Sequence, residues 1–139
     1  QAVPFKKALR ILVVEDEPLI RQILIRYLEA DNHSVEIAIN GREGLEKFLT
    51  GYFDLIITDR AMPEMSGDQM ASAIKKEWPD KPILMITGFG DIMEARGESV
   101  DVDLVINKPF TLSDIREAVG KVIHDKTTPA RKSSSKTDQ

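Results

Sequence analysis

Four short apolar runs each end in residues of types that could do metal or phosphate chemistry, namely Glu15, Asp16, Asp59, Thr87 and Lys108. The runs are ILVVED at 11–16, LIITD at 55–59, ILMIT at 83–87 and LVINKP at 104–109. Three carboxylates at one place repel one another unless a cation lies among them. Oxygen ligands without nearby His or Cys favour Mg²⁺, which typically joins carboxylates to a phosphate. A lysine and a hydroxyl suit phosphoryl oxygens, so the set contains the groups for phosphoryl transfer to an aspartate.

These side chains can act together only if the apolar runs are parallel strands of one sheet. A further short strand is predicted at 35–38, and helix-like segments with apolar residues at spacings of three and four follow the strands. In the helix after Asn40-Gly41, the residues expected to face inward are Leu45, Phe48 and Leu49. The segment around 91–99 reads only weakly as a helix, because Gly97 costs about 1 kcal/mol there relative to Ala.

Five strands alternating with five helices predict an α/β fold with a parallel sheet covered on both faces. In open sheets of this kind the ligand site lies at the carboxyl edge of the strands. The chemistry-bearing residues are therefore expected at a single edge. The two histidines, His33 and His124, are expected to be surface residues, whereas Met62 and Met65 are expected to pack.

The length and composition limit the classes of protein to consider. A chain of 139 residues with 42% hydrophobic residues is the size of one domain. We expect this domain at 9–124 and a disordered tail or linker at 125–139, where no apolar periodicity is found. The net charge of −4 argues against direct nucleic-acid binding, and no apolar stretch is long enough for membrane insertion. We expect a cytoplasmic location.

The strand-end residues resemble those of the receiver domain of two-component response regulators. The resemblance rests on the acidic pair Glu15-Asp16, on Asp59 followed by MPEMSG at 62–67, on Thr87-Gly88 and on Lys108-Pro109-Phe110. It covers roughly residues 9–124, and its specificity comes from the order and spacing of the motifs. It implies a doubly wound, flavodoxin-like (β/α)5 fold with the strand order 2-1-3-4-5.

The resemblance also implies a role for each residue at the metal. Asp59 would be the phosphoacceptor nucleophile and Asp16 a direct ligand of Mg²⁺. Glu15 would help to hold the ion, through water, and the backbone carbonyl of Ala61 would complete the protein ligands.

Two further residues are assigned to the phosphoryl group by the same resemblance. Thr87 would donate a hydrogen bond to a phosphoryl oxygen, and Lys108 would neutralise its charge. In receiver domains the bond before the proline is cis, so a cis peptide bond is predicted between Lys108 and Pro109. On base rates alone, only about one X-Pro bond in twenty is cis.

The implied partners are a histidine kinase or a histidine phosphotransfer protein, from whose phosphohistidine Asp59 would take the phosphoryl group. The protein would carry out its own phosphorylation and dephosphorylation, and the phosphoryl group would shift the conformational population. A weak homodimer is left open. The start at Gln1 and the polar tail fit both a single-domain regulator and the receiver of a hybrid histidine kinase.

Two alternative functions are weighed against the receiver. A phosphatase similar to haloacid dehalogenases also uses a strand-end aspartate and Mg²⁺, but needs a second acid where this chain has Ala61. A pseudo-receiver would bind proteins without being phosphorylated. One departure from the family pattern concerns signal transmission: Val105 stands where the family often has Tyr or Phe, and Phe89 is a candidate substitute.

Overall fold

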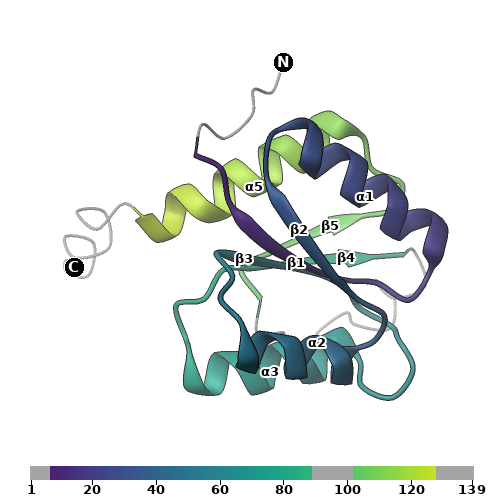
Figure 1. Cartoon of the computed structure of the whole chain (residues 1–139), viewed down its shortest axis with the longest axis vertical. Coiled ribbons are helices and arrows are strands. Elements are labelled where there is room, and N and C mark those ends of the chain that lie inside the picture. Colours follow the sequence, from purple (N-terminus) through teal and green to yellow (C-terminus); the bar gives the residue numbers. More distant parts are fainter. Residues whose placement is uncertain (1–6, 89–101, 128–139) are drawn as a thin grey trace.

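The computed structural model describes residues 7–88 and 102–127 of the chain (Figure 1). The elements are, in chain order, β1 (Arg10–Val14), α1 (Pro18–Ala30), β2 (Ser34–Ala38), α2 (Gly41–Thr50), β3 (Leu55–Asp59), α3 (Gly67–Glu77), β4 (Ile83–Thr87), β5 (Leu104–Asn107) and α5 (Leu112–Thr127). The weak helix predicted around 91–99 and the candidate substitute Phe89 lie outside the described residues. Helix α5 reaches Thr127, three residues beyond the expected end of the domain at 124.

The five strands form one parallel sheet with the order β2-β1-β3-β4-β5. Helices α1 and α5 cover one face of this sheet, and α2 and α3 cover the other (Figure 1). This arrangement confirms the doubly wound, flavodoxin-like fold. Because all strands run in the same direction, their carboxyl ends lie at a common edge.

Alternate residues of the central strands supply two separate hydrophobic cores. In β1, Ile11 and Val13 point to the core beneath α1 and α5, whereas Leu12 and Val14 point to the core beneath α2 and α3. All five residues of β3 and of β4 are buried. Strands buried on both faces explain why these segments read as continuous apolar runs.

Capping residues fix where the helices near the sheet's carboxyl edge begin. Pro18 occupies the first turn of α1, where its missing N–H has no consequence. Asn40 caps α2 by accepting a hydrogen bond from the Glu43 N–H at 2.8 Å. Ser66 and Gln69 form a reciprocal capping box at the start of α3. The loops that carry the strand-end residues therefore lead into defined helix starts.

Two sequence expectations about burial are wrong. Leu49 is 57% exposed, because it lies about 100° around the helix from the buried Phe48 and so points away from the sheet. His33 is buried, because the turn after α1 lies under the start of β1, where the Leu9 N–H donates to His33 Nδ1 at 3.0 Å. His124 is exposed as expected, and Met62 and Met65 pack against the core beneath α2 and α3.

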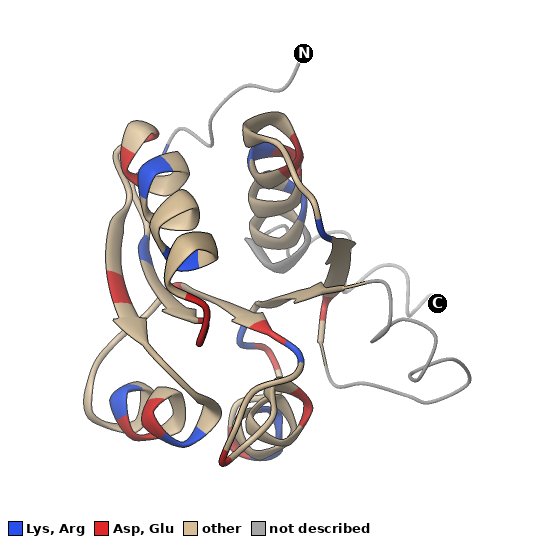
Figure 2. Cartoon of the chain, turned by 90° about the vertical axis from the view of Figure 1, so that its right-hand side faces the viewer, with Lys and Arg blue, Asp and Glu red and all other residues tan. Residues whose placement is uncertain are grey.

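Charged residues of both signs lie on the helices and at the strand ends, as Figure 2 shows. Among the described residues, no helix is long and apolar enough to span a bilayer.

Candidate metal and phosphate site

Three carboxylates converge at the carboxyl edge of the sheet. Glu15 follows β1 directly, and Asp59 is the last residue of β3, the strand that pairs with β1. One ligand atom each from Glu15, Asp16 and Asp59 lies within 4.8 Å of the others. Glu15 and Asp59 are buried, whereas Asp16 is exposed. The predicted juxtaposition of these three residues is confirmed.

Lys108 brings a positive charge to the same place. Its Nζ lies 3.2 Å from Oδ1 of Asp59 and 4.0 Å from Oε1 of Glu15. Thr87 is buried at the end of β4, where its carbonyl accepts a hydrogen bond from the Lys108 N–H at 2.8 Å. The peptide bond between Lys108 and Pro109 is cis, as predicted.

The buried polar atoms of this site fit a cation and a phosphoryl group. Glu15 Oε1, Asp59 Oδ1 and Thr87 Oγ1 are buried and make no hydrogen bond in the described part of the chain, although the Lys108 ammonium lies near the two carboxylate oxygens. Buried polar atoms are nearly always hydrogen-bonded, so such a cluster needs an explanation. Carboxylate oxygens supply the donors that Mg²⁺ prefers, and a threonine hydroxyl can donate to a phosphoryl oxygen.

Burial and mutual repulsion change the proton affinity of the site. Burial, with the neighbouring Asp59, raises the pKa of Glu15 to about 7. Burial also raises the pKa of Asp59, and the Lys108 ammonium offsets this rise only in part. Burial by itself lowers the pKa of Lys108, but the Asp59 and Glu15 carboxylates outweigh that effect and raise it. Without a further cation, the cluster therefore holds its negative charge at a cost.

Ala61 is the second residue after Asp59 and is exposed in the loop that leads to α3. The predicted use of its carbonyl oxygen as a metal ligand stays a prediction.

The sequence assigned no supporting role to two residues of the site. Arg21, in the second turn of α1, donates from Nη1 to the Glu15 carbonyl oxygen at 2.9 Å. Gly67, the first residue of α3, lies so close to Asp59 that a Cβ at Gly67 would collide with the Asp59 carbonyl oxygen. An arginine one helical turn after an acidic pair, and the glycine that ends MPEMSG, were the available signals.

An apolar groove adjoins the site. It has a volume of about 340 Å³ and lies between α1, which contributes Ile20, Ile23 and Tyr27, and the segment that contains Lys108 and Phe110. The rings of Tyr27 and Phe110 meet edge to face with their centroids 6.2 Å apart. A surface suited to an apolar partner therefore begins directly beside the charged cluster.

The chain was compared with known proteins. The family model of the response regulator receiver domain matches residues 11–120. The transcriptional regulatory protein ResD of Bacillus subtilis is 36% identical over 107 residues, which cover 76% of this chain and 44% of ResD. The probable transcriptional regulator ycf27 of Cyanidium caldarium is 34% identical over 119 residues, which cover 85% of this chain and 47% of that protein. The chain thus spans about half the length of these curated relatives.

Solved structures agree with the sequence matches. The response regulator TrrA of Thermotoga maritima, crystallised in complex with Mg²⁺-BeF, aligns with a TM-score of 0.74 and 36% identity, covering 81% of this chain and 97% of TrrA. The chemotaxis response regulator CheY4 of Vibrio cholerae aligns with a TM-score of 0.76 and 30% identity, covering 84% of this chain and 99% of CheY4. Fold, acidic cluster and family model thus agree, and the chain belongs to the family of response regulator receiver domains of two-component signalling.

Proposed function

We propose that this receiver domain accepts a phosphoryl group on the Asp59 carboxylate from a phosphohistidine of a partner protein. The observation that carries the proposal is the position of Asp59, whose Oδ1 lies beside the Lys108 ammonium and within the group of three carboxylates. A nucleophile, a cation and an acidic cluster at one sheet edge are the parts that transfer to an aspartate requires.

In the transfer step, a carboxylate oxygen of Asp59 attacks phosphorus and forms the new P–O bond. The P–N bond to the partner's histidine breaks, and its electron pair returns to the imidazole nitrogen. Lys108 offsets the negative charge of the phosphoryl oxygens, and the Thr87 hydroxyl donates a hydrogen bond to one of them. Later, water attacks the phosphorus of the acyl phosphate, the P–O bond to Asp59 breaks, and inorganic phosphate leaves as the Asp59 carboxylate is restored.

The residues that would hold Mg²⁺ are Glu15, Asp16, Asp59 and the carbonyl of Ala61. The bound ion supplies positive charge to the phosphoryl oxygens. The support for these ligands is the convergence of the three carboxylates and the burial of Glu15 and Asp59, whose two negative charges the single Lys108 ammonium does not fully offset.

The phosphodonor is a histidine kinase or a histidine phosphotransfer protein that docks in the apolar groove. The groove begins at Lys108 and continues along Ile20, Ile23 and Tyr27 of α1. A helix with an apolar face would bury these side chains and bring its phosphohistidine to Asp59.

Residues 9–124 act as the receiver and residues 125–139 as a tail or linker, whose first three residues, 125–127, continue helix α5. The output lies on a partner protein or on another part of a longer polypeptide. The curated relatives are about twice as long as the matched region and include transcriptional regulators. A fused DNA-binding domain therefore fits this family, whereas the receiver itself makes its contacts with proteins.

The test is phosphorylation by acetyl phosphate with Mg²⁺, followed by intact-mass measurement. Wild type is expected to gain one phosphoryl adduct, and Asp59→Asn is expected to gain none. Asp54→Asn, altered just before the amino end of the same strand, is the matched control and is expected to be phosphorylated. An absence of adduct on wild type with every phosphodonor would favour the pseudo-receiver, and rapid hydrolysis of general phosphate esters would favour the phosphatase.

A further inference from the structure

The loop of residues 60–66, here called the β3–α3 loop, carries the Ala61 carbonyl and is held both at its ends and by α2. The loop follows the last residue of β3, Asp59, and leads into the first residue of α3, Gly67. A hydrogen bond from the Gly67 N–H to the Arg60 carbonyl oxygen, at 2.7 Å, joins its two ends. Near its C-terminal end, the Met65 carbonyl oxygen accepts a hydrogen bond from the Gly41 N–H at 3.0 Å. Gly41 belongs to a different part of the chain, the first turn of α2. The α2 helix therefore attaches the loop away from its own ends.

The attachment depends on Gly41 having no side chain. A Cβ at this position would collide with the Met65 carbonyl oxygen and would lie 2.8 Å from the Met65 carbonyl carbon. Both are backbone atoms, so any larger residue must move α2 and the loop apart. Gly44, one turn further along α2, is different, because a Cβ there would meet the side-chain ends of Met70 and Val14.

A second contact joins the same two segments. Nε of Arg42, in the first turn of α2, lies 3.2 Å from Oε1 of Glu64 in the β3–α3 loop. Both side chains are more than half exposed, so the pair by itself contributes little stability. Glu64 has a positive φ of 71°, which shows that the loop makes a tight turn at this residue.

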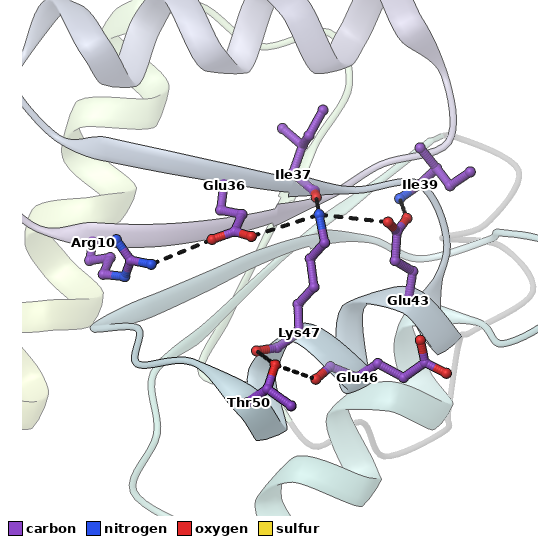
Figure 3. Close-up of polar contacts among 8 residues, drawn as sticks. All are labelled: Arg10, Glu36, Ile37, Ile39, Glu43, Glu46, Lys47 and Thr50. Atoms are coloured by element: carbon purple, nitrogen blue, oxygen red, sulfur yellow. Dashed lines mark hydrogen bonds and ion pairs between the residues drawn. The ribbon is translucent and has the colours of Figure 1, made fainter.

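Helix α2 is in turn held against the edge strand β2 by side chains, as Figure 3 shows. The Lys47 ammonium donates to the Ile37 carbonyl oxygen at 2.5 Å and lies 3.6 Å from a Glu43 carboxylate oxygen. The other oxygen of Glu43 accepts a hydrogen bond from the Ile39 N–H at 2.8 Å. Because its own position is fixed, α2 can fix the loop.

We propose that Gly41 and Arg42 position the β3–α3 loop for Mg²⁺ binding, although neither residue is among the metal ligands. This inference rests on the proposed function, since it assumes that the Ala61 carbonyl binds the ion. Gly41 sets the distance between α2 and the loop, and the Arg42–Glu64 pair restrains the turn between Ala61 and Met65. Both act as positioning residues.

The experiment measures the Mg²⁺ dissociation constant by calorimetric titration and the stability by thermal unfolding without Mg²⁺. Gly41→Ala is expected to raise the dissociation constant about tenfold, the size expected when groups supporting a metal ligand are disturbed. Gly44→Ala is the matched control. It is expected to lower the unfolding temperature through crowding in the core while keeping the dissociation constant within about twofold of wild type.

Exchanging the charges of Arg42 and Glu64 provides a second test, which should leave the protein folded because both side chains are more than half exposed. Arg42→Glu is expected to raise the Mg²⁺ dissociation constant about threefold, and the double variant with Glu64→Arg is expected to restore it. If Gly41→Ala does not fold, the dissociation constants of these two charge variants test the positioning role by themselves.

The outcomes separate this inference from the proposed function. Equal dissociation constants in wild type, Gly41→Ala and Arg42→Glu would overturn the positioning role alone, because wild type would still bind Mg²⁺. An equal loss of affinity in Gly44→Ala would also overturn it, since the effect would then be general destabilisation. A wild type that binds no Mg²⁺ would overturn the proposed function itself.

Discussion

Nζ of Lys108 lies 3.2 Å from Oδ1 of Asp59, so the end of β5 supplies a cation to the end of β3. We expect Lys108→Met to slow phosphorylation by acetyl phosphate about 100-fold, because the charge of the incoming phosphoryl group is then offset less well. A time course of intact masses measures the rate. Lys81→Met is the control, since Lys81 is also partly buried but precedes β4 at the opposite end of the sheet. A wild-type rate in Lys108→Met would exclude this role.

Asp59→Asn is expected to stabilise the metal-free protein. Asp59 is only 5% exposed, and burial raises its pKa despite the nearby Lys108, so its ionised form is held at a cost. The neutral amide removes that cost but also the ion pair with Lys108. We therefore expect a gain of about 1 kcal/mol in the free energy of unfolding, measured by urea denaturation in EDTA.

Addition of Mg²⁺ should make wild type more stable than Asp59→Asn, which reverses their order of stability in EDTA. An ion that binds only the folded state raises the free energy of unfolding. At concentrations well above the dissociation constant, the increase is proportional to the logarithm of the ratio of ion concentration to dissociation constant. Wild type should gain about 2 to 3 kcal/mol at a hundredfold excess over that constant. Asp59→Asn, which lacks a metal ligand, should gain much less. A gain of equal size in both proteins would contradict the use of Asp59 as a ligand.

His33 should make stability depend on pH below neutrality. Burial lowers its pKa from the ordinary value of 6.5, and the Asp31 carboxylate, itself paired with Arg116, opposes this only in part. The unfolded chain therefore takes up a proton at a higher pH than the folded protein, and stability falls as the pH drops below about 6.5. Protonation of Nδ1 would also remove its hydrogen bond from the Leu9 N–H.

The comparison for His33 is the variant His33→Asn, whose amide oxygen can accept the same hydrogen bond but does not titrate. Between about pH 7.5 and pH 5.5, wild type is expected to lose about 1 kcal/mol more unfolding free energy than the variant. Urea denaturation at both pH values measures the difference. Parallel losses in the two proteins would show that His33 does not cause the pH dependence.

Lys47 should protect the exposed edge of β2. Its Nζ donates to the Ile37 carbonyl oxygen, which would otherwise be free to pair with another chain (Figure 3). Lys47→Met is expected to lower the free energy of unfolding by about 1 kcal/mol and to increase self-association. Denaturation and analytical ultracentrifugation measure the two effects. Lys76→Met, at an exposed position of α3, is the control and should remain like wild type in both measurements.

Much of the fold and of the candidate site could be predicted from the sequence because both depend on local patterns. Strands buried on both faces require apolar runs, and a parallel sheet places every carboxyl end at one edge. Residues such as Asp59 and Lys108 were therefore recognisable from their position directly after such runs. The capping residues Asn40 and Ser66 likewise act through neighbours three positions away.

Burial of single side chains was predicted less well. His33 was expected at the surface, but its burial depends on how the turn after α1 packs under the start of β1. Leu49 was expected to face inward from its spacing, but it lies about 100° around α2 from the buried Phe48 and points to solvent. Val105, which stands where the family often has an aromatic residue, is 41% exposed on β5.

The sequence by itself determined the type of fold, the edge that bears the site and the chemical groups available there, because periodicity and strand ends are local properties. The tertiary structure alone decided which groups contact one another. The ion pair of Lys108 with Asp59 and the close approach of Gly41 to Met65 both join segments that are far apart in the sequence. Such contacts depend on strand register and helix placement, which no local pattern specifies.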